Sequence, residues 1–286
     1  MGIRRHGDRR TWRELLDYWL MLHIALTIAG SDPIGGAGIQ ADLKTFHQFG
    51  VYGEAVITLL TVQNTVRLAR VDCIPAELVL AQLAAVLEDI PPHAAKTGAL
   101  GNREIVEAIA AAAADFRFPL VVDPVMISKH GQPLISPDAI AAVRDLLLPR
   151  ATLICPNLAE AEELTGLPVR TVEDMRAAAK RLCEMGAKAA LVKGGHLQES
   201  AVDVLFNGQD WREFTAPHFD TPHTHGTGCT LSAGIAAEMA RGATIDAAVA
   251  RAKSYVTQAI RSNPGLGHGA GPLNHHAATG LKASAK

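Results

Sequence analysis

The sequence predicts an α/β protein whose central sheet is mostly parallel and covered by helices on both faces. Short runs rich in apolar and β-branched residues alternate with alanine- and leucine-rich helical segments along most of the 286-residue chain. Repeated alternation of strand and helix favours right-handed crossovers, and therefore a parallel sheet that is buried on both faces. One section breaks the alternation: two β-rich runs, 201–206 and 211–215, flank Asn207-Gly208. That pattern is typical of a hairpin and adds a small antiparallel edge to the predicted sheet.

Local patterns predict the individual elements. Val79, Leu83, Val86 and Leu87 recur at helical spacing, for example, so the helix over Ala76–Asp89 has one apolar face to pack on a sheet. The predicted strands are His23–Ala29, Glu54–Thr61, Ala94–Thr97, Leu120–Asp123, Thr152–Cys155 and Ala189–Lys193. The predicted helices are Ala37–Phe49, Ala76–Asp89, Arg103–Phe116, Pro137–Leu147, Thr171–Met185 and Cys229–Arg241. No interdomain linker or internal repeat interrupts the series, so we expect one domain.

The composition favours a small-molecule partner. The net charge of −2 provides no basic field for nucleic acid or a membrane surface, and 5% aromatic residues are few for base stacking. No apolar run approaches the roughly 18 residues of a membrane-spanning helix. The four cysteines never form a CxxC pair, which argues against a disulfide framework and a zinc site. We therefore expect a cytoplasmic protein that binds neither nucleic acid nor membrane.

The two ends of the chain differ from the part between them. Residues 1–22 are arginine-rich but include three acidic residues and lack the apolar core of a secretory signal. They could form an amphipathic helix, a disordered leader, or a product of translation upstream of Met21; we expect a poorly ordered, dispensable extension. The folded domain is expected at 23–274. The stretch from Gly265 should wrap the surface, and 275–286 should form a frayed tail.

Two loops after predicted strands carry candidates for substrate binding, because ligands of open parallel sheets bind at the carboxyl ends of the strands. The loop AGSDPIGGAGIQAD (29–42) has glycines that let backbone approach a ligand, but it matches neither a Walker A nor a dinucleotide-binding motif. It could equally be a tight turn. Gln63 offers an acceptor beside two donors, which suits an aminopyrimidine edge, or it could satisfy its own loop backbone.

Four further polar residues follow predicted strands and suit phosphate or magnesium. Asp123 could serve such a site or cap the turn at Pro124. Asn157 and Glu160 could face magnesium waters and phosphate, or they could form an ordinary helix-capping box. Lys193 lies beside two glycines and could counter phosphate charge or be simply exposed. The spacing alone leaves both interpretations open at each position.

The turn Gly226-Thr227-Gly228-Cys229 gives the sharpest functional signal because it directly precedes an alanine-rich helix. Free N–H groups and the helix dipole at such a start form an anion hole suited to a transferring phosphoryl group. Cys229 at this helix end is expected to have a lowered pKa and to accept or orient the proton of an attacking hydroxyl. The alternative is a small buried thiol that packs against the turn.

These segments together resemble the hydroxymethylpyrimidine/phosphomethylpyrimidine kinases of thiamine biosynthesis, in the ribokinase-like superfamily. The resemblance rests on segments that occur in order from about His23 to Asn274: ALTIAGSDPIGGAGIQADLKTF, ITLLTVQNT, VVDPVM, CPNLAEAEELTG, VKGGH and THGTGCTLSAGIA. It implies a three-layer α/β/α ribokinase-like fold, usually a homodimer, that uses ATP and Mg²⁺. It also implies phosphorylation of 4-amino-5-hydroxymethyl-2-methylpyrimidine and then of its monophosphate to the diphosphate.

The resemblance implies binding roles at five matched positions. Gln63 and Asp42 would hold the aminopyrimidine, and Gly30 would line the same pocket. Lys193 and Asp123 would lie near the phosphates of ATP.

The remaining matched positions would carry the chemistry. Asn157 and Glu160 match the superfamily pair that organises magnesium, with Glu160 acting through water. Gly226, Thr227, Gly228 and Cys229 would form the anion hole. Cys229 takes the place of the aspartate base of sugar-kinase relatives.

One departure from the family bears on substrate choice. The family usually has a methionine after the glycine of a K-x-G-M segment, and this chain has Ala99 there. That methionine packs on the pyrimidine ring, so the pocket is expected to be roomier here. A pyridoxal or pyridoxine kinase is therefore one alternative. A non-catalytic pyrimidine-binding sensor is another, although a sensor would need no anion hole.

Overall fold

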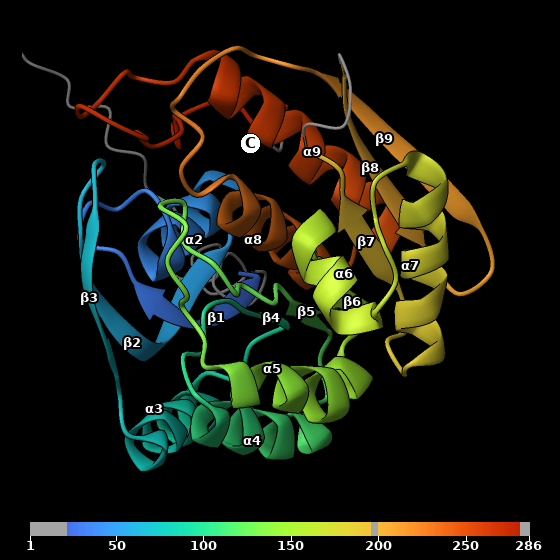
Figure 1. Ribbon diagram of the computed structural model, residues 1–286. Helices are drawn as coiled ribbons and strands as arrows, with labels where there is room; N and C mark the ends of the chain where they lie inside the picture. The colour runs from blue at the N-terminus through green and yellow to red at the C-terminus, as the bar shows by residue number, and fades with distance from the viewer. Residues whose placement is uncertain (1–21, 196–199, 281–286) are drawn as a thin grey trace, which may run out of the picture.

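A nine-stranded sheet is the middle layer of the computed structural model, which describes residues 22–195 and 200–280 (Figure 1). The strand order is β3-β2-β1-β4-β5-β6-β7-β8-β9. Strands β1, β2 and β4 to β7 run parallel, and β3 pairs antiparallel with β2. The hairpin β8–β9 adds a second antiparallel edge beside β7. The strand bounds are β1 Ile24–Ser31, β2 Tyr52–Gln63, β3 Leu68–Cys73, β4 Ala94–Thr97, β5 Leu120–Val122, β6 Leu153–Ile154, β7 Ala190–Lys193, β8 Ser200–Phe206 and β9 Trp211–Pro217.

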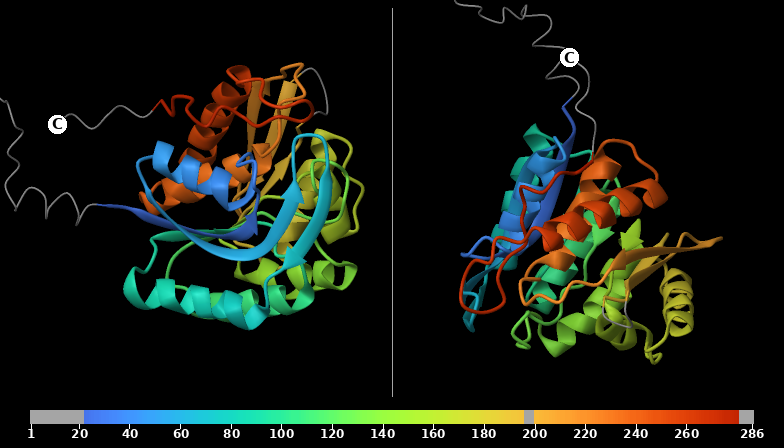
Figure 2. Two further views of the ribbon diagram at one scale, coloured as in Figure 1. Left: turned by 90° about the vertical axis from the view of Figure 1, so that its left-hand side faces the viewer. Right: turned by 90° about the horizontal axis from the view of Figure 1, so that it is seen from above.

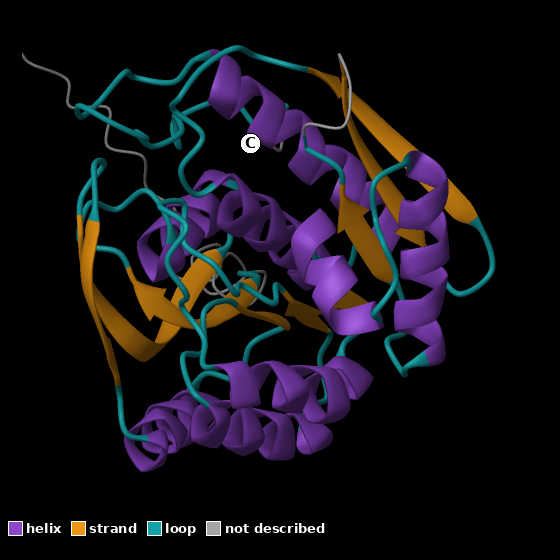
Figure 3. Cartoon of the chain, in the orientation of Figure 1, coloured by secondary structure: helices purple, strands orange, loops and turns teal. Residues whose placement is uncertain are grey.

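Helices cover both faces of this sheet, which confirms the predicted three layers (Figures 2 and 3). One face carries α3 (Ala76–Asp89), α4 (Arg103–Ala112), α5 (Pro137–Ala142), α6 (Leu158–Thr165) and α7 (Val172–Glu184). The other face carries α2 (Gly38–Gln48), α8 (Thr227–Ala240) and α9 (Ile245–Arg261).

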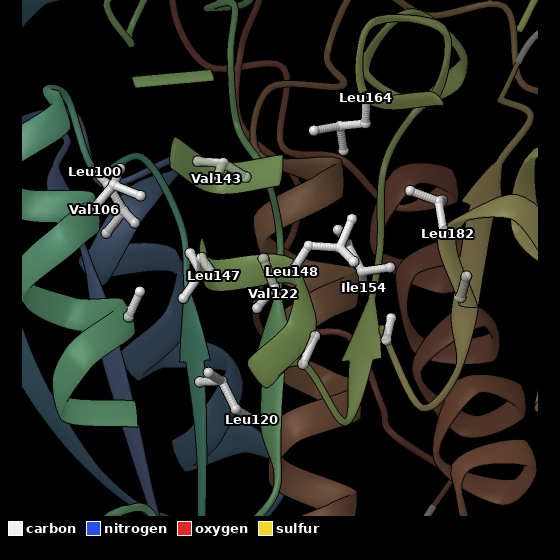
Figure 4. Close-up of a cluster of buried hydrophobic side chains, with 14 of the residues drawn as sticks. Leu100, Val106, Leu120, Val122, Val143, Leu147, Leu148, Ile154, Leu164 and Leu182 are labelled. Carbon is white, nitrogen blue, oxygen red and sulfur yellow. The ribbon is translucent and has the colours of Figure 1, made fainter. Parts of the chain in front are cut away.

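Strand β5 shows why the sheet needs cover on both sides. Leu120 and Val122 point into the core beneath α4 and α5, where Leu147 and Leu148 also pack (Figure 4). Val121, between them, points into the opposite core with α8 and α9. Since successive side chains of a strand face opposite sides, an uninterrupted apolar run is buried only between two layers of helices.

Three elements, β3, α6 and α9, have no counterpart among the predicted ranges, although the capping box considered at Asn157 and Glu160 anticipated the start of α6. Strand β3 pairs with β2 at the edge of the sheet, where the sequence prediction placed no strand. Helix α9 was also missed, although Thr244 caps its start and its buried residues recur at helical spacing: Ala248, Val249, Ala252, Tyr255, Val256 and Ala259. Helix α8 begins at Thr227, two residues before the predicted start, so the glycine turn lies partly inside its first turn.

The described part of the chain extends past the expected domain boundary at residue 274. His275 and Ala277 are buried at 7% and 6% exposure. The Tyr255 hydroxyl donates to the His275 carbonyl at 2.9 Å, and the Gln48 side-chain amide donates to the Ala277 carbonyl at 2.9 Å. The packed unit therefore includes the start of the predicted tail, whereas the extension expected at 1–22 lies, except for Leu22, outside the described residues.

Among residues 22–195 and 200–280, no helix combines the length and apolarity that crossing a bilayer requires.

Candidate active site

The carboxyl ends of the parallel strands open into a pocket of about 470 Å³. This is the edge at which ligands of open α/β sheets bind. Every site residue proposed from the sequence except Asp42 lines this pocket: Gly30, Gln63, Asp123, Asn157, Glu160, Lys193, Gly226, Thr227, Gly228 and Cys229. The fold thus brings together segments that are far apart in the sequence.

A second cavity of about 350 Å³ adjoins the first. The two share six lining residues, and these include Lys193, Thr227 and Gly228. The second cavity runs from there between β9 and α9, where Leu231, Val256 and Ile260 give it apolar walls. The start of α8 is therefore a wall common to both cavities.

Gly226 caps the start of α8 in a conformation that requires glycine. Its φ is +84°, and a Cβ there would lie 1.8 Å from the Gly36 carbonyl oxygen. The loop before α2 and the turn before α8 therefore touch through their backbones. Thr227 N–H donates to the Thr224 carbonyl at 3.3 Å. Gly228 and Cys229 follow in the first turn, where N–H groups lack intrahelical acceptors, so this helix end has the form of an anion-binding site.

Lys193 reaches the same place from the end of β7. Its Nζ lies 2.8 Å from Asp123 Oδ1, and the Ser232 hydroxyl donates to Asp123 Oδ2 at 3.1 Å. A Cβ on Gly228 would lie 3.3 Å from Lys193 Nζ. Burial alone would lower the pKa of Lys193, but Asp123 and Glu160 raise it overall. Lys193 is therefore a cation at neutral pH and lies beside the first turn of α8.

Asn157 and Glu160 form a complete capping box at the start of α6. Glu160 N–H donates to Asn157 Oδ1 at 3.0 Å, and Asn157 N–H donates to Glu160 Oε2 at 2.8 Å. Both residues also line the pocket. The capping interpretation is therefore confirmed, and it is compatible with a role toward phosphate because the cap fixes both side chains at the pocket wall.

The donor set at this wall suits magnesium held through water. Burial raises the pKa of Glu160 to about 7, and Asp123 acts in the same direction, although Lys193 opposes them. A divalent cation would favour the ionised carboxylate. Within the described residues no cluster of three or more His, Cys, Asp or Glu side chains could hold a metal. The Glu160 carboxylate at the pocket wall fits Mg²⁺, which typically keeps several waters and binds substrate phosphates with one or two carboxylates.

Cys229 lines the pocket from the first turn of α8, but the expected lowering of its pKa is wrong. Burial raises the pKa of this thiol to about 11, and Asp42 and Asp123 add to the rise. Lys96 and the Gly38 N–H act in the opposite direction without outweighing burial. The prediction from helix position omitted desolvation, which disfavours any charged form.

Asp42, expected to hold the aminopyrimidine, is the one proposed residue that does not line the pocket. Its side chain is completely buried on α2. Lys96 Nζ lies 3.0 Å from Asp42 Oδ2 and 3.1 Å from Oδ1, and the Thr27 hydroxyl donates to Oδ2 at 2.6 Å. In this structure the Asp42 carboxylate therefore binds protein groups behind the pocket.

Asp32 and His225 were missed by the sequence prediction, although both line the pocket. His225 Nε2 lies 2.9 Å from Asp32 Oδ2, which also accepts the N–H groups of Gly36 and Ala37 at 3.0 and 2.8 Å. The pair joins the two glycine-rich loops. Both residues stand inside quoted motifs, so their position was visible in the sequence, but their pairing depends on tertiary structure.

Gly30, Gln63 and Ala99 also line the pocket, from the carboxyl end of β1, the last residue of β2 and the loop after β4. A Cβ on Gly30 would lie 2.5 Å from Leu59 Cδ1, so glycine is needed there for close packing. Ala99 contributes only a methyl group to this wall. The pocket therefore combines an amide side chain with small residues that leave room for a ring.

Comparison with known proteins identifies the family of the chain. The family model for phosphomethylpyrimidine kinase matches residues 32–274. The chain is 42% identical over 261 residues to a hydroxymethylpyrimidine/phosphomethylpyrimidine kinase of Bacillus subtilis, covering 90% of this chain and 96% of the relative.

Two solved structures are also similar. A pyridoxal kinase from Staphylococcus aureus, in complex with AMP-PCP and pyridoxal, matches with a TM-score of 0.82 and 36% identity over 90% of this chain and 94% of its own. A phosphomethylpyrimidine kinase from Clostridium difficile matches with a TM-score of 0.75 and 42% identity, over 83% of this chain and 99% of its own. Family model, sequence relatives and structures agree: the chain belongs to the phosphomethylpyrimidine kinase family and has the ribokinase-like fold.

Proposed function

We propose that the protein transfers the γ-phosphoryl group of ATP to 4-amino-5-hydroxymethyl-2-methylpyrimidine, and then phosphorylates the monophosphate to the diphosphate, in thiamine biosynthesis. One observation carries the proposal: two cavities meet at Lys193 and the first turn of α8. An acceptor in the first and a nucleotide in the second would present their reacting groups to the same N–H groups.

The second cavity suits ATP. Its apolar walls at Leu231, Val256 and Ile260 can receive the base, while Lys193 and the start of α8 lie where the phosphates would reach the acceptor. Asn157 and Glu160 would hold Mg²⁺ through water, and the bound ion would neutralise phosphate charge.

The first cavity suits a flat heteroaromatic alcohol. The Gln63 side chain can pair with a ring nitrogen and an adjacent amino group, because it offers an acceptor beside two donors. The hydroxyl oxygen would attack the γ-phosphorus as the bond from that phosphorus to the bridging oxygen of ADP breaks. The hydroxyl proton would pass to the sulfur of Cys229, which must then be a thiolate. Lys193 and the N–H groups of α8 would stabilise the charge on the transferring group.

The experiment is an ADP-release assay with the purified full-length chain and three acceptors in parallel. We expect kcat/KM for the hydroxymethylpyrimidine to exceed that for pyridoxal at least tenfold, with the pyrimidine monophosphate also accepted. Release of ADP with pyridoxal alone would overturn the substrate assignment.

Pyridoxal phosphorylation is the second candidate, and Ala99 favours it. Because this position contributes only a methyl group, a larger hydroxymethylated ring can enter, and the similar Staphylococcus aureus structure is that of a pyridoxal kinase. A non-catalytic sensor is a third, from another class. It would bind the pyrimidine in calorimetry and release no ADP with any acceptor.

We further propose a cytoplasmic homodimer. All four cysteines are free thiols, which suits a reducing compartment. Leu60 and Val62 on β2 are 45% and 55% exposed, and they share one face of the strand because they are two residues apart. A second copy of the chain packed on this face would remove them from water.

A further inference from the structure

Lys96 is a buried cation to which the proposed mechanism assigns no task. It lies on β4, and its side chain and that of its partner Asp42 are both 0% exposed. Buried ion pairs contribute little to stability, because desolvation offsets their attraction. The neighbouring β1 residue Thr27 adds a hydrogen bond to the pair at 2.6 Å. Burying this network has a cost in desolvation free energy, and the network lies beside a pocket, so we expect Lys96 to have a functional role.

The position of Lys96 is directly behind the catalytic pocket. A Cβ on Gly98 would lie 3.3 Å from Lys96 Nζ, and Gly98 lines the pocket together with Cys229. Helix α8, which carries Cys229, packs against β4, which carries Lys96. The ammonium group of Lys96 therefore contacts Asp42 and also lies beside Gly98, a residue of the pocket lining.

The charged groups around Cys229 come from three elements. Lys96 of β4 is the largest influence that opposes burial and lowers the pKa of the thiol. Gly38 N–H, at the start of α2, also lowers it through a hydrogen bond to the sulfur. Asp42 of α2 and Asp123 after β5 raise it. Lys96 in turn remains charged, since burial alone would lower its pKa but Asp42, Cys229 and Asp123 raise it overall.

We propose that Lys96 is a positioning residue for proton transfer: its ammonium group, fixed by Asp42, stabilises the thiolate of Cys229. The inference rests on the proposed function. In that reaction the acceptor oxygen gains the γ-phosphoryl group, ADP leaves with the electron pair of the broken bond, and the hydroxyl proton converts the Cys229 thiolate to a thiol. Lys96 and Gly38 N–H together form an anion hole for the base, separate from the one that α8 offers the phosphoryl group.

The test measures the ionisation of Cys229 itself. Purified full-length protein, without substrates, is exposed briefly to iodoacetamide at a series of pH values from 7 to 10.5, and alkylation of Cys229 is quantified by peptide mass spectrometry. The variants are Asp42→Asn, which leaves Lys96 without its carboxylate, and the double variant Lys96→Met with Asp42→Asn, which removes both charges. Lys188→Met, at an exposed lysine two residues before the start of β7, is the matched control for the loss of one positive charge.

The sign of each shift decides the outcome. In Asp42→Asn, we expect Cys229 to be alkylated at a pH about one unit lower than in wild type. In the double variant, we expect Cys229 to be alkylated at a pH at least one unit higher than in Asp42→Asn. Lys188→Met should match wild type. Identical profiles for all folded variants, or the reverse order, would overturn the role of Lys96; circular dichroism identifies which variants are folded.

This readout is independent of the phosphoryl acceptor. If no acceptor is phosphorylated, the proposed function fails while the alkylation order still tests Lys96. If the alkylation order holds, kcat at pH 7.5 should be about tenfold lower in the double variant than in Asp42→Asn. Equal kcat values would show that the thiolate plays no part in the rate.

Discussion

Cys229 brings two opposing physical effects together in one side chain. Its position in the first turn of α8 favours the thiolate through the helix dipole, whereas removal from water favours the thiol. Burial dominates, since the pKa rises to about 11. The effect of the helix dipole could be predicted from the position of Cys229 in the sequence. The effect of burial could not, because it depends on which residues pack around the sulfur.

Replacement of Cys229 by alanine tests its role in proton transfer. We expect kcat to fall by about 10² or more, because a positioned base contributes roughly that factor, while the fold is retained. Steady-state ADP release and circular dichroism provide the two measurements. A near-normal kcat in the folded variant would remove Cys229 from the chemistry.

The raised pKa of Cys229 also predicts a pH dependence. A group whose pKa is about 11 is almost entirely protonated at pH 7, so the thiolate fraction rises about tenfold per pH unit toward pH 10. We expect kcat/KM to rise with pH over that range. In Cys229→Asp the rise should be absent above pH 8, because a carboxylate is already ionised there. Parallel profiles for the two proteins would contradict the assignment.

At the scale of the elements, the glycine turns could be predicted from the sequence, but the residues that each turn or helix contacts across the fold could not. Gly226 and Gly36 can be recognised in the sequence as turn glycines that precede helices, and the structure places them in backbone contact. The capping box of Asn157 and Glu160 was also readable from spacing, as the hydrogen bonds show. Asp42 was assigned to the substrate from the family resemblance alone, and its contact with Lys96 in this structure depends on how α2 packs against β4, which no spacing in the sequence predicts.

Gly226→Ala tests the contact between the two glycine turns. A Cβ at 1.8 Å from the Gly36 oxygen, on a residue with φ of +84°, must separate the loops and displace the first turn of α8. We expect kcat to fall at least tenfold and the melting temperature to drop. Gly208→Ala is the matched control: its φ is +93°, but the nearest atom is the Lys188 carbonyl oxygen at 3.5 Å. It should cost about 1 kcal/mol of stability from strain alone and leave kcat unchanged.

The order of the strands is a property of the whole molecule. Alternation of strand and helix predicted a parallel, doubly covered sheet, but not the antiparallel edge strand β3. It pairs with the part of β2 that carries Leu60 and Val62, and both of these side chains are exposed. Exposed apolar side chains on one strand face are the feature that a partner subunit would cover.

Leu60→Asp tests the proposed homodimer. A buried aspartate in the interface would be strongly unfavourable, so light scattering should show a dimer for wild type and a monomer for the variant. Leu78→Asp, on α3, is the matched control because that leucine is 50% exposed against 45% for Leu60. A monomeric wild type would refute the dimer, and dissociation by both variants would refute this face.

At the scale of the whole molecule, we propose that the cavities sharing Lys193 and the start of α8 pass a phosphoryl group from ATP to a hydroxymethylpyrimidine. Phosphorus NMR of the purified protein with MgATP and this pyrimidine tests the claim most directly. We predict that the signal of the pyrimidine monophosphate appears first and that of the diphosphate follows, with one ADP formed for each phosphoryl group transferred. Formation of ADP and inorganic phosphate without a phosphorylated pyrimidine would contradict the account.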